Sequence, residues 1–212
     1  RRMKSAGDLL SVVKTMKALA AVSIRQYQRA VDSLRDYNRT VEMGLQIVLK
    51  ERMGATMKRK NVPIKRLGVI VFGSDQGLCG QLNEQISTFA LDHIKSTGVK
   101  KENRKVLSVG ARVADYVEDA GQTVDELLST PGSTAGITPL VQEIIMIIDE
   151  WHFRGNVDHF FLFYNEYLTG ATYHPHMLQL LPVDEAWLKQ IARKKWESKS
   201  LPIFRMDGEK IF

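Results

Sequence analysis

The first sixty residues form an almost unbroken run of helix-forming residues. No proline occurs between Gly7 and Lys60, and only Gly44 and Gly54 weaken the run. We therefore predict a single helix over 7–60. At about 1.5 Å per residue it would extend roughly 75 Å, whereas the mean globular helix has about 11–12 residues. A helix of this length needs a partner along it.

Apolar side chains recur along this helix alternately every four and every three residues. Ten of the twelve positions in the series are apolar or aromatic: Leu9, Val13, Met16, Ala20, Ser23, Tyr27, Ala30, Leu34, Tyr37, Val41, Gly44 and Val48. A sustained period of 3.5 residues is typical of a coiled coil, so this series predicts a second helix packed along the seam. The alternative interpretation is an amphipathic helix that lies on its own domain.

The first turns of the helix carry a second apolar surface beside the seam, formed by Leu10, Val12, Leu19, Val22 and Ile24. A helix that is apolar on most sides is buried on most sides, so we expect this end to sit inside a sleeve of other protein. Four basic residues interrupt the surface at spacings suited to separate acidic groups: Lys14, Lys17, Arg25 and Arg29. A solvated basic face is the alternative.

Beyond Pro63 the pattern changes to short β-branched runs that alternate with helical periods. We predict strands over 67–72, 105–109, 157–164 and 172–181, and helices over 81–96, 111–120 and 138–151, with a short strand or a loop over 123–128. This alternation predicts a Rossmann-like domain with a mostly parallel sheet flanked by helices, so the fold class is α/β with a long N-terminal coiled-coil helix. We divide the chain into 1–60, 61–183 and a C-terminal segment, 184–212, with a short helix over 186–196.

The net charge of +6 is unevenly distributed between these regions. Residues 1–60 contain fourteen basic and five acidic side chains, whereas the remaining residues are acidic on balance. The long helix should therefore face an acidic partner. The single cysteine, Cys79, excludes an intrachain disulfide and is typical of a reducing compartment. No sequence pattern of a signal peptide or a membrane span is present.

A glycine-rich turn, 73–80, lies between a predicted strand and a predicted helix, where dinucleotide enzymes hold pyrophosphate. Its spacing matches neither G-x-G-x-x-G nor a Walker loop, and Asp75 would bring negative charge toward a phosphate. We interpret it as a tight turn that presents a contact loop. No histidine lies near Cys79 in the sequence to activate it as a nucleophile, so we predict no catalytic residue and no cofactor.

Two further classes of site are disfavoured. His174 and His176 share one strand face, but Pro175 separates them and no Cys, Asp or Glu lies close in the sequence to complete a metal site. A DNA-reading helix would leave the apolar surface of the long helix uncovered, so we predict no nucleic-acid partner.

Two motifs are specific enough to compare with known families. The first is Val-Lys-Thr-Met-Lys-Ala-Leu-Ala-Ala at 13–21, followed by Ser-Ile-Arg at 23–25, and the second is Gly-Ser-Asp-Gln-Gly-Leu-Cys-Gly-Gln-Leu-Asn at 73–83. The first resembles the N-terminal helix of the gamma subunit of F-type ATP synthases, and the second resembles that family's Ser-Asp-Arg-Gly-Leu-Cys-Gly-Gly-x-Asn loop. The order of elements is also similar over nearly the whole chain.

The resemblance implies a non-catalytic rotor subunit whose long helix threads the ring of alpha and beta subunits. It implies partner contacts at Lys14, Met16, Lys17 and Arg25 on the helix, and at Ser74, Asp75, Gln76 and Cys79 in the loop. The α/β domain would lie against the epsilon subunit and the c-ring. The protein would be peripheral, on the cytoplasmic face of the membrane.

The sequence departs from the family pattern in three places. Gln76 stands where an arginine is usual and Gln81 where a glycine is usual, which suggests a divergent branch. Nothing up to Phe212 matches the family's second long helix, so we expect a truncated chain or an absent tail. The bare seam would then make the fragment self-associate or leave its first helix frayed. The alternatives are a Rossmann-like nucleotide-binding protein or enzyme with a helical extension, and an unrelated coiled-coil adaptor.

Overall fold

The computed structural model describes residues 2–52, 63–168 and 172–196, with side chains from residue 10 onward and none for 50–52. The chain divides into two compact units. The first contains Arg1–Gly54 with Gly132–Ala135 and Ile191–Phe212, and the second contains Ala55–Pro131 with Gly136–Gln190.

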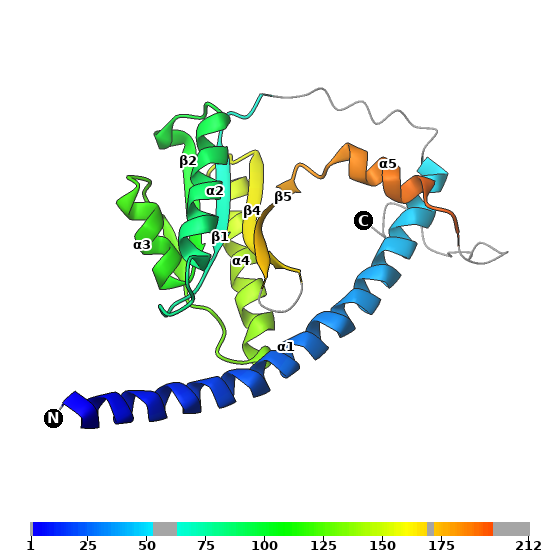
Figure 1. The fold of residues 1–212 in the computed structure, drawn as a ribbon. Coiled ribbons are helices and arrows are strands. Elements are labelled where there is room, and N and C mark those ends of the chain that lie inside the picture. Colours follow the sequence, from blue (N-terminus) through cyan, green and yellow to red (C-terminus); the bar gives the residue numbers. More distant parts are fainter. Residues whose placement is uncertain (1, 53–62, 169–171, 197–212) are drawn as a thin grey trace. The chain divides into compact units, whose positions relative to one another are not determined.

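The first unit is dominated by one helix, α1 (Arg2–Arg52), which Figure 1 shows as a single continuous element. It begins earlier than the predicted 7–60, and residues 53–62 lie outside the described part. Near its end the α1 side chains are buried: Val48 and Leu49 have almost no exposed surface. Gln46 donates to the carbonyl of Lys194, whose ammonium pairs with Glu42 at 2.7 Å.

The second unit is built on a five-stranded sheet in the order β3-β2-β1-β4-β5. Its strands are β1 (Leu67–Phe72), β2 (Arg104–Val109), β3 (Glu126–Leu128), β4 (His159–Tyr167) and β5 (Tyr173–Leu181). β1 pairs parallel with β2 and with β4, and β2 pairs parallel with β3, whereas β5 pairs antiparallel with β4 at the edge. The predicted α/β class with a mostly parallel sheet is confirmed, and 126–128 is a strand rather than a loop.

Helices cover both faces of this sheet, as the sequence pattern predicts for strands that are apolar on both sides. On one face, α2 (Leu82–Ser96) and α3 (Ala111–Asp119) contribute Ile86, Ile94 and Val113 to a core with Phe163 of β4. On the other face, α4 (Ile137–Phe153) contributes Ile144, Ile148 and Trp151. Short 3-10 turns precede β2 (Lys101–Asn103) and α4 (Thr134–Gly136).

A final helix, α5 (Glu185–Arg193), follows β5. It corresponds to the predicted short helix over 186–196. The expectation that the family's second long helix is missing from this chain concerns residues 197–212, which lie outside the described part. None of the described helices combines the length and the apolarity that crossing a membrane requires.

Candidate partner-binding surfaces

The glycine-rich loop leaves β1 at Gly73 and enters α2 at Leu82. Its first N–H donates to the carbonyl of Val109 at 2.9 Å, which anchors the loop to β2. Position 73 requires glycine because a Cβ there would lie 2.5 Å from both Asn83 Oδ1 and Val113 Cβ. The loop therefore begins pressed against the first turns of α2 and α3.

Asp75 holds the loop from within. Its carboxylate accepts hydrogen bonds from the N–H of Ala111 at 2.9 Å, the N–H of Thr130 at 2.7 Å and the hydroxyl of Thr130 at 2.6 Å. Burial alone would raise the pKa of Asp75, but these hydrogen bonds outweigh it and lower the pKa below its ordinary value. Asp75 thus joins the loop to the start of α3 and to the segment after β3.

A second network closes the loop between Ser74, Cys79 and Asn83. The N–H of Ser74 donates to Asn83 Oδ1 at 2.9 Å, and Asn83 Nδ2 donates to Ser74 Oγ at 2.9 Å and to Cys79 Sγ at 3.2 Å. Ser74 Oγ in turn donates to the carbonyl of Gln76 at 2.7 Å. The thiol of Cys79 also lies 3.5 Å from Ser74 Oγ and 3.9 Å from the carbonyl of Gln76. None of these three partners is a base or a cation, so the described contacts do not activate the thiol as a nucleophile.

The tip of the loop faces outward. Gln76 is exposed, and Leu78 is 95% exposed, with a φ of 65° in the left-handed region. Of the four loop residues predicted to bind a partner, only Gln76 therefore presents an unengaged side chain. Ser74, Asp75 and Cys79 shape the loop. Leu78 is not among the residues predicted from the sequence, although a large apolar residue inside a polar, glycine-rich turn can indicate a contact residue.

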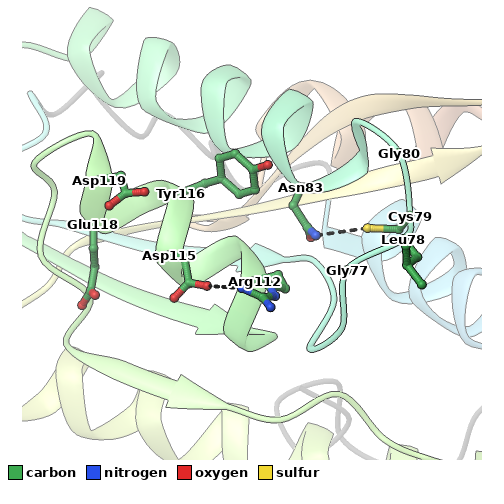
Figure 2. Close-up of a pocket in the computed structure, with 10 residues that line it drawn as sticks. All are labelled: Gly77, Leu78, Cys79, Gly80, Asn83, Arg112, Asp115, Tyr116, Glu118 and Asp119. Carbon is green, nitrogen blue, oxygen red and sulfur yellow. Dashed lines mark hydrogen bonds and ion pairs between the residues drawn. The ribbon is translucent and has the colours of Figure 1, made fainter. Parts of the chain in front are cut away.

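A pocket of about 590 Å³ opens beside the loop, between it and α3 (Figure 2). Its charged lining consists of one arginine, Arg112, against three carboxylates, a formal balance of −2: Asp115, Glu118 and Asp119. Arg112 is already paired with Asp115 at 3.2 Å. An acidic lining repels phosphate, and the first N–H of α3 is bound by Asp75, so this site does not suit a dinucleotide.

The apolar surface of α1 over residues 10–41, which combines seam positions with the apolar residues beside them, is a second candidate surface because its side chains are exposed. Eleven large apolar or aromatic residues between Leu10 and Val41 are 46% to 68% exposed, among them Met16, Leu19 and Tyr37. The other exposed members are Val12, Val13, Val22, Ile24, Val31 and Leu34. Of the remaining seam positions, Ala20, Ser23 and Gly44 are exposed, Tyr27 and Ala30 are half-buried, and Val48 is buried. The side chain of Leu9 lies outside the described part.

The basic residues predicted to bind a partner lie on the same stretch of α1. Lys14, Lys17 and Arg25 are exposed, and no carboxylate among the described side chains forms an ion pair with them. Exposed apolar and unneutralised basic side chains thus occur together at this end of the helix.

The structure supplies a carboxylate beside the two histidines, which their sequence neighbourhood lacks. Antiparallel pairing places Glu166 of β4 opposite His174 of β5, and Glu166, His174 and His176 lie together. Glu166 lies eight residues before His174 in the chain, so the pairing of β4 with β5, rather than proximity in the sequence, brings it to the histidines.

The fold and the exposed surfaces define a class of protein: an α/β domain with a long helix whose exposed apolar side chains are typical of a subunit of a larger assembly. Comparison with known proteins identifies the family within this class. The ATP synthase family profile matches residues 1–212. The ATP synthase gamma chain of Desulfitobacterium hafniense is 26% identical over 220 residues, covering 100% of this chain and 71% of its relative. That of Pasteurella multocida is 24% identical over 195 residues, covering 92% and 67%.

A solved structure agrees on the fold. The central stalk and c-ring structure of the Tetrahymena thermophila mitochondrial ATP synthase contains a chain with a TM-score of 0.57 at 17% identity, over 78% of this chain and 71% of that one. The present chain belongs to the ATP synthase gamma chain family, whose members are the non-catalytic rotor subunits of the central stalk.

Proposed function

We propose that this chain turns inside an alpha–beta ring and couples ion flow through a membrane c-ring to ATP synthesis or hydrolysis. In this role α1 is one half of the shaft, and rotation of an asymmetric shaft changes the nucleotide affinity of each catalytic site in turn. The α/β domain meets the epsilon subunit and the c-ring. The chain is then a peripheral protein on the cytoplasmic face of the membrane.

The observation that carries this proposal is the exposed apolar face of α1. Complete burial of a large apolar side chain contributes about 1.5–3 kcal/mol, so covering eleven half-exposed ones would contribute on the order of 10 kcal/mol before the costs of association. A second shaft helix on the seam and the inner wall of a ring on the remaining surface account for apolar side chains on most sides of one helix.

The N-terminal part of α1 is proposed to contact the lever region of a catalytic beta subunit. Met16 would supply an apolar contact, and Lys14, Lys17 and Arg25 would pair with acidic groups of that lever. These cations are exposed, so they are available to a partner. Charge complementarity of this kind favours register and speed of association more than affinity.

The loop after β1 is proposed to face the base of the ring through Gln76 and Leu78. Ser74, Asp75 and Cys79 act indirectly, because their hydrogen bonds hold the loop in the shape that exposes these two side chains. With glutamine in place of the arginine usual at position 76, this contact is uncharged.

Reconstitution tests the proposal. The chain, expressed with any coding sequence that follows Phe212 in its gene, is mixed with alpha and beta subunits, and co-purification and ATP hydrolysis are measured. We expect an active assembly whose hydrolysis falls several-fold with Lys17→Glu or Met16→Trp. Lys100→Glu, a charge reversal at an exposed position of the α/β domain, serves as the matched control and should leave hydrolysis unchanged.

Failure to assemble with any alpha–beta ring, combined with nucleotide binding by the chain alone, would favour the Rossmann-like nucleotide-binding alternative. Sedimentation of the chain without partners tests the expected self-association through the α1 seam. A strictly monomeric chain with a fully ordered, solvated α1 would contradict that expectation.

A further inference from the structure

We propose that Glu166, His174 and His176 form a binding site for a divalent transition metal, zinc above all, at the edge of the sheet. The three residues lie on β4 and β5, outside both partner-binding surfaces described above. The inference therefore stands independently of the proposed rotor function.

The strand register brings the three side chains to one face. Glu166 is directly opposite His174, and Tyr164 is opposite His176 in the antiparallel pair. Since side chains alternate between faces, His174 and His176 point the same way, and Glu166 joins them from the facing strand. Leu162, which shares this parity on β4, packs with the α4 core, so the group lies on the α4 face of the sheet.

The distances suit one shared ion. Glu166 Oε2 lies 3.3 Å from His174 Nε2 and 3.6 Å from His176 Nδ1, and the three ligand atoms all lie within 4.8 Å of one another. Zinc bonds to histidine nitrogen and carboxylate oxygen are about 2.0–2.2 Å, which places tetrahedral ligands about 3.4 Å apart. Small side-chain rotations would bring all three atoms into such a sphere.

The donor set identifies the class of ion. Two imidazoles and one carboxylate are typical zinc ligands, and imidazole favours zinc, copper or nickel over calcium and magnesium, which prefer oxygen. The three side chains are 39% to 47% exposed, so a fourth position remains open to water or to a donor from another chain. The ion would join β4 to β5, beside which the described residues place no further strand.

Tyr164 lies beside this donor set on β4. Its ring packs against His176, with the centroids 5.1 Å apart, and restrains that imidazole.

The competing explanation is an ion-pair cluster, in which the two histidines face Glu166 without a metal. Titration with zinc distinguishes a metal site from an ion-pair cluster. The 212-residue chain is titrated with zinc chloride in a metal-free, non-chelating buffer near neutral pH, by calorimetry and by thermal unfolding. We expect one zinc ion per chain and a higher unfolding temperature with zinc. Cobalt(II) in its place should give the visible absorption of a tetrahedral site.

Three variants locate the site. Glu166→Gln and His176→Gln should each weaken zinc binding at least about tenfold and abolish the thermal stabilisation. Glu166→Gln keeps the shape of the side chain, and circular dichroism checks that both variants fold. His152→Gln, which removes an exposed histidine from α4, is the matched control and should bind zinc like the unaltered chain. The absence of saturable binding, or equal affinity in Glu166→Gln and the unaltered chain, would overturn the proposal.

Discussion

The α/β domain and helix α1 use equally regular apolar patterns with opposite outcomes. In the domain, the apolar positions of β1 and β2 are buried against α2, α3 and α4. In α1, residues of the same types at helical spacing remain about half exposed from Leu10 to Val41. An apolar pattern predicts that a surface will be buried, but it does not predict by what. The surface is buried within the chain only where a helix or strand of the same unit packs on it.

Substitutions in the two regions should therefore affect different properties. Replacing a buried side chain of the domain by alanine removes contacts that the chain makes with itself, so it should lower the free energy of unfolding. Replacing an exposed apolar side chain of α1 by alanine removes contacts that form only with a partner, so it should leave the fold intact and weaken the complex.

The sharpest contrast is between Phe163→Ala and Leu34→Ala. Phe163 is fully buried and meets Phe89 edge-on at 6.0 Å, so we expect its loss to destabilise the chain by about 3–5 kcal/mol. Leu34 is 56% exposed, and its truncation should change the free energy of unfolding by less than about 0.5 kcal/mol. Urea unfolding followed by tryptophan fluorescence measures both. Equal losses in the free energy of unfolding for the two variants would mean that Leu34 is buried by other residues of the same chain.

A smaller effect is expected at the start of the loop. Gly73→Ala forces a Cβ to within 2.5 Å of Asn83 and Val113, and should cost about 1–3 kcal/mol in thermal or urea unfolding. Gly77→Ala, in the same loop with no atom within 4 Å of the added carbon, is the matched control. It should be neutral or slightly stabilising. A neutral Gly73→Ala would show that the loop is not pressed against α2 and α3.

Asp75→Asn should cost roughly 1–2 kcal/mol near neutral pH, because the amide cannot accept every hydrogen bond that the carboxylate accepts. The pKa of Asp75 is lowered in the folded chain. Its contribution is therefore complete above the unfolded pKa of about 3.9 and is lost as the pH falls through the folded pKa. The difference between the unaltered chain and Asp75→Asn should shrink below about pH 4 in unfolding measured as a function of pH. A difference that does not change with pH would contradict this assignment.

The smallest effect on folding is expected at the loop tip. Leu78→Ala should shift the free energy of unfolding by less than about 0.5 kcal/mol, because the side chain is almost fully exposed. Its predicted effect is a weaker interaction with the alpha–beta ring, measured by co-purification at increasing salt and dilution. A marked loss of stability would show that Leu78 packs within the chain.

The sequence predicted the regular elements well because hydrophobic periodicity is a local signal. The strand over 67–72 and the helices near 82–96 and 111–119 were predicted to within a residue or two. The interior of the loop was not predicted, since Asp75 binds Thr130 across 55 residues of chain. The cluster of Glu166, His174 and His176 was not predicted for the same reason: β-pairing, not sequence adjacency, brings Glu166 to His174. The exposed tip at Leu78 depends on a left-handed backbone that apolar patterning does not encode.

The central claim, that α1 is a shaft helix covered only on assembly, is tested most directly by amide hydrogen exchange. Exchange is compared between the chain alone, at concentrations where sedimentation shows no self-association, and the chain in an alpha–beta complex. We predict that amides over residues 10–41 slow by about 100-fold or more on assembly, while those of β1 and β2 are unchanged. Protection of α1 equal to that of β1 in the chain alone, or no change on assembly, would contradict the account.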